Sequence, residues 1–88
     1  AFLHEAGHSA HYSFNQKLFK AMLDEKNEVV KEFLNSNEIQ QTAFKVSDYA
    51  TNSPLEFVAE VWKRIQQGRT FPNDVMALYK KYGGPAIS

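Results

Sequence analysis

The feature that most constrains this chain is a five-residue motif near its start, His4-Glu5-Ala6-Gly7-His8. It reads H-E-x-x-H, the pattern in which two histidines of one helix hold a zinc ion. Residues four apart on a helix share one face and lie about 6 Å apart along its axis, so both imidazoles can reach one tetrahedral metal ion. Glu5 lies about 100° further round, where its carboxylate can take a proton from a metal-bound water. The motif therefore requires a helix here and a third ligand from elsewhere.

Length and composition bound the class of protein. Eighty-eight residues with 43% hydrophobic content predict one small globular domain, residues 1–88. Ten basic and ten acidic residues cancel, and no basic stripe or polybasic run favours nucleic acid or a membrane surface. The absence of cysteine excludes a disulfide scaffold and a thiolate metal site. No apolar run approaches the roughly 18 residues of a membrane span. Because the chain opens three residues before the motif and without Met, we expect a piece of a longer protein.

The hydrophobic pattern predicts a compact, mainly α domain of four or five helices. We expect a first helix over Ala1 to Phe14, in which Gly7 lets another backbone approach closely. Asn15 to Asn35 reads as two short amphipathic helices or one bent helix, and Glu38 to Ala43 could start a further helical turn. Two more helices are expected, over Ser53 to Gln67 and from Asn73 to a stop at Gly83.

The helix that starts at Ser53 has clear local signals. Ser53 is a good N-cap, Pro54 suits the first helical position, and Glu56 stands where a capping-box Glu belongs. Its expected inward face holds Leu55, Val58, Ala59, Trp62 and Ile65.

Glu56 is also the candidate third ligand, 48 residues past His8. A Glu on a helix beside the first one would complete a His2Glu zinc site, with a fourth position left for water. Glu60 follows by one helical turn and could accept the spare N–H of a ligating histidine, which would set its tautomer. The alternatives are that Glu56 only caps its helix, and that Glu60 is a solvated charge or an ion-pair partner of Arg64.

Two other positions near the motif are excluded as ligands. His11 is seven residues from His4, about 10 Å along the axis, and is expected to be a surface or packed residue. The metzincin pattern requires a third histidine six residues after the second, and that position holds Phe14.

The motif, with Tyr49 seven residues before Glu56 and the pattern P-x-E-F-x-A-E over Pro54 to Glu60, resembles a zincin family with a glutamate ligand. This gluzincin-type group includes the catalytic domain of anthrax lethal factor, the clostridial Pro-Pro endopeptidases, and zincin domains of phage head proteins and polymorphic toxins. The resemblance covers about twenty residues closely, and residues 15–45 match nothing in it.

The resemblance implies a role for each matching position. His4, His8 and Glu56 would be the zinc ligands, Glu5 the general base, and Glu60 the partner of a ligating histidine. Tyr49 would donate a hydrogen bond to the oxyanion of the tetrahedral intermediate, the alternative being an ordinary packed loop aromatic. Zincins place a β-sheet before the active-site helix. Two alternatives follow: this chain is the C-terminal half of a zincin whose upstream sheet belongs to an N-terminal part of the protein, or the domain manages without a sheet.

Three functions follow as hypotheses. The first is a zinc-dependent metalloendopeptidase, a toxin effector or processing enzyme, which hydrolyses a peptide or protein substrate through a water activated by Glu5. The second is an inactive zinc-binding remnant that serves as a structural or interaction module in a phage or toxin protein. The third is a helical partner-binding domain without metal. For the first we expect a monomer with Zn²⁺ as cofactor and no nucleic-acid or membrane partner. The sequence leaves the location of the parent protein open, a secreted or virion-associated protein being one option.

Overall fold

The computed structural model describes residues 2–86, so Ala1 and residues 87–88 of the predicted domain lie outside the described residues. The described part of the chain contains six α-helices and one short 3-10 helix: α1 (Phe2–Phe14), α2 (Gln16–Met22), α3 (Glu28–Asn35), α4 (Asn37–Phe44), η1 (Tyr49–Thr51), α5 (Pro54–Gln66) and α6 (Asn73–Lys81). None of these helices combines the length and the apolar composition that crossing a membrane would require.

The prediction of a mainly α domain is confirmed, with one more helix than the upper end of the expected range. Side-chain caps separate the helices between α1 and η1 from one another. Asn27 Oδ1 accepts from the backbone N–H of Val29 at 2.8 Å and starts α3 separately from α2. Ser36 Oγ accepts from the N–H of Ile39 at 3.2 Å, so the expected turn after Ser36 becomes the complete helix α4.

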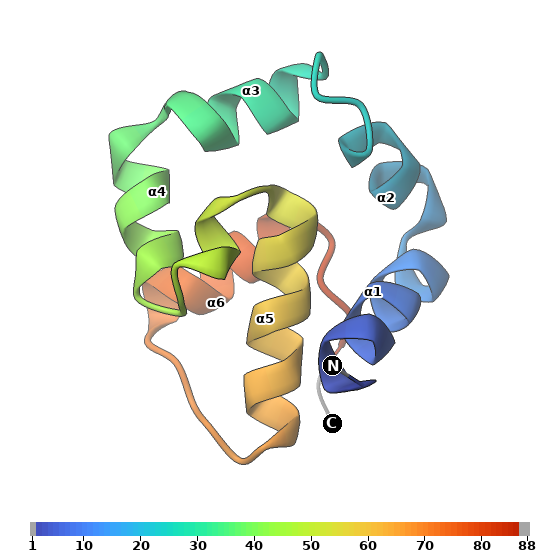
Figure 1. Cartoon of the computed structure of the whole chain (residues 1–88), viewed down its shortest axis with the longest axis vertical. Coiled ribbons are helices and arrows are strands. Elements are labelled where there is room, and N and C mark those ends of the chain that lie inside the picture. The colour runs from blue at the N-terminus through green and yellow to red at the C-terminus, as the bar shows by residue number, and fades with distance from the viewer. Residues whose placement is uncertain (1, 87–88) are drawn as a thin grey trace.

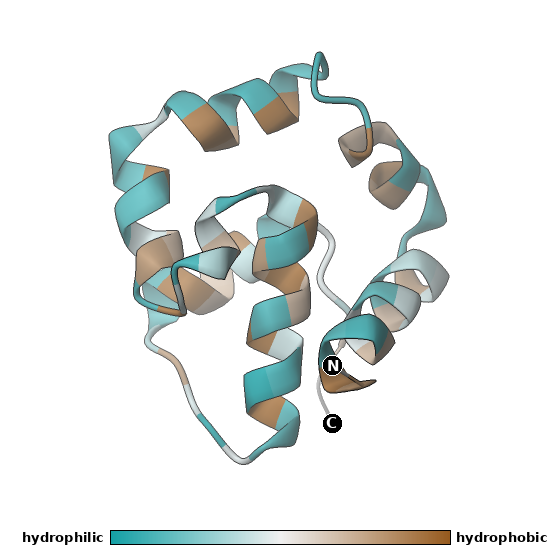
Figure 2. Cartoon of the chain, in the orientation of Figure 1, coloured by the Kyte–Doolittle hydropathy of each residue, from teal (hydrophilic) through white to brown (hydrophobic). Residues whose placement is uncertain are grey.

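Helix α5 is the central element, with the other helices arranged around it (Figure 1). Hydrophobic and hydrophilic residues alternate around the outer helices (Figure 2), as expected for elements with one solvent-facing side. The first half of α5 is instead buried on nearly every side, which is more than the single inward face predicted for it. Its buried residues are Pro54, Leu55, Phe57, Val58, Ala59, Glu60 and Val61.

The core beside α5 is built on aromatic side chains from α3, from α5 and from the end of α6. Phe33, Phe57 and Tyr82 are fully buried, and their ring centroids lie 5.6–6.4 Å apart in tilted or edge-to-face pairs. Tyr82 caps the C-terminal end of α6, and the following Gly83 has a φ of +73°, a left-handed conformation that ends the helix. This core holds α5 in place and leaves its N-terminal half facing α1.

Gly7 sets how closely α1 and α5 approach. A Cβ atom at this position would lie 3.0 Å from both Cα and the carbonyl oxygen of Ala59, so the two backbones are in direct contact there. The expectation of a close backbone approach at Gly7 is therefore confirmed. Because α1 and α5 form the most extensive contact between helices, the residues flanking Gly7 on α1 face those flanking Ala59 on α5.

Candidate metal centre

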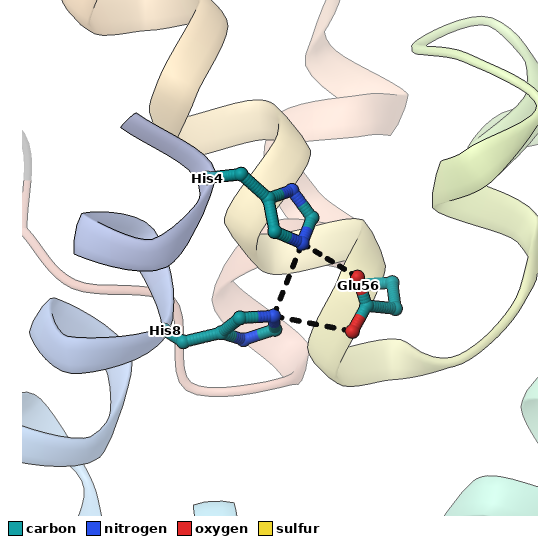
Figure 3. A group of neighbouring side chains, drawn as sticks. All are labelled: His4, His8 and Glu56. Carbon is teal, nitrogen blue, oxygen red and sulfur yellow. Dashed lines mark hydrogen bonds and ion pairs between the residues drawn. The ribbon is translucent and has the colours of Figure 1, made fainter. Parts of the chain in front are cut away.

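His4, His8 and Glu56 converge across the contact between α1 and α5 (Figure 3). One ligand atom from each lies within 4.8 Å of the others. His4 Nε2 is 2.6 Å from Glu56 Oε2, His8 Nε2 is 3.1 Å from Glu56 Oε1, and the two Nε2 atoms are 3.1 Å apart. His4 is buried, while His8 and Glu56 are half-buried, so the cluster is open on one side. His8 and Glu56 are 48 residues apart in the sequence, and the packing of α1 on α5 brings them together.

The start of α5 explains why Glu56 is available to the histidines. Ser53 caps the helix, since its Oγ accepts from the Glu56 N–H at 3.1 Å. A full capping box would also turn the Glu56 carboxylate back toward the backbone of Ser53. Here both carboxylate oxygens face imidazole nitrogens instead. Glu56 is therefore not a pure capping residue: its backbone is capped and its side chain belongs to the cluster.

Glu60 lies directly behind His4. It is 3% exposed, so the interpretation as a solvated charge is wrong. His4 Nδ1–H donates to Glu60 Oε2 at 2.7 Å, and the Ser47 hydroxyl and Arg64 Nη2 donate to Oε1 at 3.1 and 3.3 Å. Lys63 Nζ is 3.6 Å away. Burial by itself would raise the pKa of this carboxyl, but the bonds from His4 and Ser47 and the Lys63 charge bring the pKa below its usual value, and Glu60 stays ionised.

The bond to Glu60 determines what His4 offers to the cluster. A histidine that keeps its proton on Nδ1, toward Glu60, presents the lone pair of Nε2 toward Glu56 and His8. In that tautomer, His4 Nε2, a Glu56 oxygen and His8 Nε2 are three donor atoms that one cation could bind together. Two imidazole nitrogens and one carboxylate oxygen are the donor set that catalytic Zn²⁺ sites use, with a further position open. The residues present therefore fit a zinc ion.

Tyr49 lies over the other side of His4. It belongs to η1, and its ring stacks on the imidazole with centroids 5.1 Å apart and planes 17° apart. The side chain is 49% exposed, which differs from an ordinary aromatic packed into the core. The negative charge of Glu56 raises the pKa of the Tyr49 hydroxyl, with smaller contributions from burial, Glu60 and Glu5. Tyr49 therefore keeps its proton at neutral pH and can donate it in a hydrogen bond.

Glu5 is exposed on α1, and none of the residues in the described range bonds its carboxylate. The negative charge of Glu5 nevertheless contributes to the raised pKa of the Tyr49 hydroxyl. An open depression of about 330 Å³ also borders the cluster, lined by His8, Ser9, Tyr12, Ser13 and Phe19. None of these lining residues is an acid, a lysine or an arginine, so the depression is suited to an uncharged group.

His11 is packed and not part of the cluster, in line with one of the two expectations for it. It is fully buried, and its Nε2–H donates to the carbonyl oxygen of Tyr82 at 2.8 Å. Burial lowers the pKa of the imidazole, so the ring is neutral at pH 7. His11 thus joins α1 to the end of α6.

Two partners of Glu60 were not foreseen from the sequence. Lys63 follows Glu60 by three residues, and the i, i+3 rule for helices would have found it. Ser47 is 13 residues away in a loop, and its only local signal is that Ser, Thr, Asn and Asp often cap a following turn. Its Oγ does accept from the N–H of Ala50 at 3.1 Å, but nothing in that pattern indicates the bond to Glu60.

Comparison of the chain with models of protein families, with curated proteins and with solved structures finds no match in any of the three.

Proposed function

We propose that this chain is a zinc-dependent metallopeptidase domain that hydrolyses peptide bonds. The observation that carries the proposal is the convergence of His4, His8 and Glu56, with Glu60 bonded to the far side of His4. An ion-pair cluster of one imidazolium and two carboxylates would account for His4, Glu56 and Glu60 but not for His8, whose Nε2 lies 3.1 Å from both His4 Nε2 and Glu56 Oε1. A zinc site uses all four residues, because three ligand atoms converge on the ion and a carboxylate orients one histidine through its other nitrogen.

The chain's own residues supply the remaining chemistry. A zinc ion, when bound, acts as a Lewis acid and lowers the pKa of a coordinated water to about 7. Glu5 takes a proton from the attacking water and delivers it to the leaving amine. The Tyr49 hydroxyl donates to the oxyanion that develops on the scissile carbonyl. Glu60 accepts the hydrogen bond from His4 Nδ1–H and so orients Nε2 toward the metal position. The depression beside His8 accepts an uncharged side chain next to the scissile bond.

One observation favours a second candidate, a zinc-binding module without hydrolytic activity. Zincin substrates bind as an extended strand along a sheet edge, and residues 2–86 contain no strand. The two candidates share the metal site and differ only in turnover, so one series of measurements separates them.

The first experiment is a zinc titration of the metal-free protein, followed by melting temperature. A ligand that binds only the folded state stabilises it by about 4 kcal/mol at a thousandfold excess over Kd, so a clear rise in melting temperature is expected. Glu56→Ala removes one ligand and should abolish the rise. Glu38→Ala, an exposed acid in the first turn of α4, is the matched control and should keep it. No rise with the wild-type protein would overturn the zinc site and favour the third hypothesis, a helical binding domain.

The second experiment tests turnover with a peptide library and the variant Glu5→Gln. We expect cleavage by the zinc-loaded wild type, and a loss of about 10²–10⁴-fold in kcat for the variant, since it cannot act as a base. The zinc affinity of the variant should match that of the wild type, because Glu5 is not a ligand. Equal cleavage by both proteins would show that Glu5 is not the base. Zinc uptake without cleavage of any peptide would establish the second candidate.

A further inference from the structure

Ser47 lies where the loop that carries Tyr49 meets the buried side of the metal centre. Its Oγ accepts a hydrogen bond from the N–H of Ala50 at 3.1 Å, and its hydroxyl donates to Glu60 Oε1 at 3.1 Å. A serine hydroxyl has one hydrogen, so Glu60 receives the only bond that this side chain can donate. Ser47 therefore ties the start of η1 to the middle of α5.

Both groups that Ser47 joins are in contact with His4. Glu60 accepts from His4 Nδ1–H at 2.7 Å, and the Tyr49 ring stacks on the same imidazole. The contacts form a closed ring from Ser47 through Glu60, His4 and Tyr49, and the backbone between residues 47 and 49 completes it. Any displacement of Ser47 therefore affects both the support of His4 and the tyrosine above it.

The far end of η1 is held independently of Ser47. Gln40, on α4, donates from Nε2 to the carbonyl oxygens of Thr51 and Phe33 at 3.1 and 2.9 Å. Ala50, in the middle of η1, is fully buried. Loss of the Ser47 side chain would thus loosen the Tyr49 end of the turn and leave its other end attached to α4.

We propose that Ser47 is a positioning residue of the metal centre, whose hydroxyl holds Tyr49 over His4 and fixes the Glu60 carboxylate against Nδ1. It touches neither metal nor substrate and acts through these two side chains. The catalytic consequence of this role rests on the proposed function, while its geometric part can be measured in the metal-free protein.

The test compares three variants with the wild type. Ser47→Ala removes both bonds of the hydroxyl, and Ser47→Thr retains a hydroxyl that can make them. Thr51→Ala is the matched control, since Thr51 Oγ1 donates to the carbonyl of Asp48 at 2.6 Å within the same turn and does not contact Glu60. If Ser47→Ala does not fold, Ser47→Cys replaces it, because a thiol is a weak donor of similar shape.

The first readout is the proton NMR shift of the His4 ring in metal-free protein. A stacked tyrosine ring moves these signals upfield, and Tyr49→Ala gives their position without it. Ser47→Ala should move the signals toward the Tyr49→Ala position, while Ser47→Thr and Thr51→Ala should keep the wild-type shifts. Unchanged shifts in Ser47→Ala would overturn the proposal. An equal change in Thr51→Ala would also overturn it, because it would show a general loosening of η1.

The second readout is zinc affinity and, where peptide is cleaved, kcat and KM. Ser47→Ala should bind zinc about tenfold more weakly, the lower end of the effect of partners behind a metal ligand, and Ser47→Thr should restore the affinity. Its kcat should fall with KM little changed. If the wild type cleaves no peptide while the NMR shifts change as expected, the peptidase function is overturned and the positioning role of Ser47 is supported. If the wild type cleaves peptide while Ser47→Ala keeps the wild-type NMR shifts and zinc affinity, the peptidase proposal is supported and the positioning role of Ser47 is overturned.

Discussion

At the scale of single residues, the centre depends on how the charge of Glu60 is accommodated. A buried carboxylate without partners is strongly destabilising. Glu60 has hydrogen bonds from His4, Ser47 and Arg64 and a nearby Lys63 ammonium, so it stays ionised and keeps His4 in one orientation. The same carboxylate thus serves folding, because it is fully paired, and the candidate metal site, because it sets the tautomer of a ligand.

Tyr49 offers a prediction at this scale, since the proposed function gives its ring and its hydroxyl separate roles. Tyr49→Phe keeps the stacked ring over His4 and removes the donor. We expect unchanged zinc affinity and a fall of about 10²–10³-fold in kcat, the usual effect of losing one oxyanion donor. Steady-state kinetics on a cleaved library peptide, with zinc affinity measured in parallel, checks both parts. A variant with wild-type kcat would leave Tyr49 with a packing role only.

At the scale of elements, the site exists because α1 and α5 pack in direct backbone contact. Each helix carries two of the four residues at i, i+4 spacing, so the relative placement of two rigid elements sets all their distances. The Ser53 cap fixes where α5 begins and hence which way Glu56 points. A change that separates the two helices should therefore damage the candidate metal site without altering any of its side chains.

Gly7→Ala tests this dependence. In an exposed helix the substitution would stabilise by about 1 kcal/mol, but here the new Cβ would lie 3.0 Å from backbone atoms of Ala59. Overpacking of this kind costs about 1–3 kcal/mol, so we expect a net loss of about 1 kcal/mol in unfolding free energy and a smaller zinc-induced rise in melting temperature. Ser9→Ala, on the exposed side of α1, is the control and should raise stability slightly. Denaturant unfolding of both variants, with and without zinc, tests these expected changes in unfolding free energy. A stabilised Gly7→Ala protein would contradict the close contact.

At the scale of the whole molecule, the core that supports α5 contains buried tyrosines whose ionisation opposes folding. Burial raises the pKa of Tyr82 to about 12, with a smaller contribution from Glu32, and burial likewise raises the pKa of Tyr79. The ordinary value in an unfolded chain is about 10. Above that pH the unfolded chain releases protons that the folded chain retains, so stability falls with rising pH.

The prediction is an alkaline loss of stability that starts near the ordinary tyrosine pKa. The stabilisation that comes from the raised pKa of Tyr82 is fully present below about pH 10 and is lost as the pH rises toward about 12. Over that range the free energy of unfolding falls by about 1.4 kcal/mol per pH unit. Tyr82→Phe should reduce this slope and keep stability at pH 7, because the buried hydroxyl has no partner among the described residues. Tyr12→Phe, at an exposed position, should leave the slope unchanged. Urea midpoints measured from pH 8 to pH 12 test this, and identical slopes for all three proteins would contradict it.

The sequence by itself determined the local features of the centre. The spacing of His4 and His8, the spacing of Glu56 and Glu60, and the Ser53 cap could all be recognised without a structure. These features depend on helix periodicity and on backbone groups a few residues away, so they are encoded within one turn or two of chain. The mainly helical class follows from the same periodicity.

Only the tertiary structure decided how these local features combine. The burial of α5 on nearly every side, the identity of Ala59 as the neighbour of Gly7, and the bond from Ser47 to Glu60 were not deducible from spacing. The position of Tyr49 over His4 joins residues 45 apart in the chain. Such contacts depend on how several helices pack at once around a shared core, and no short stretch of sequence carries that information.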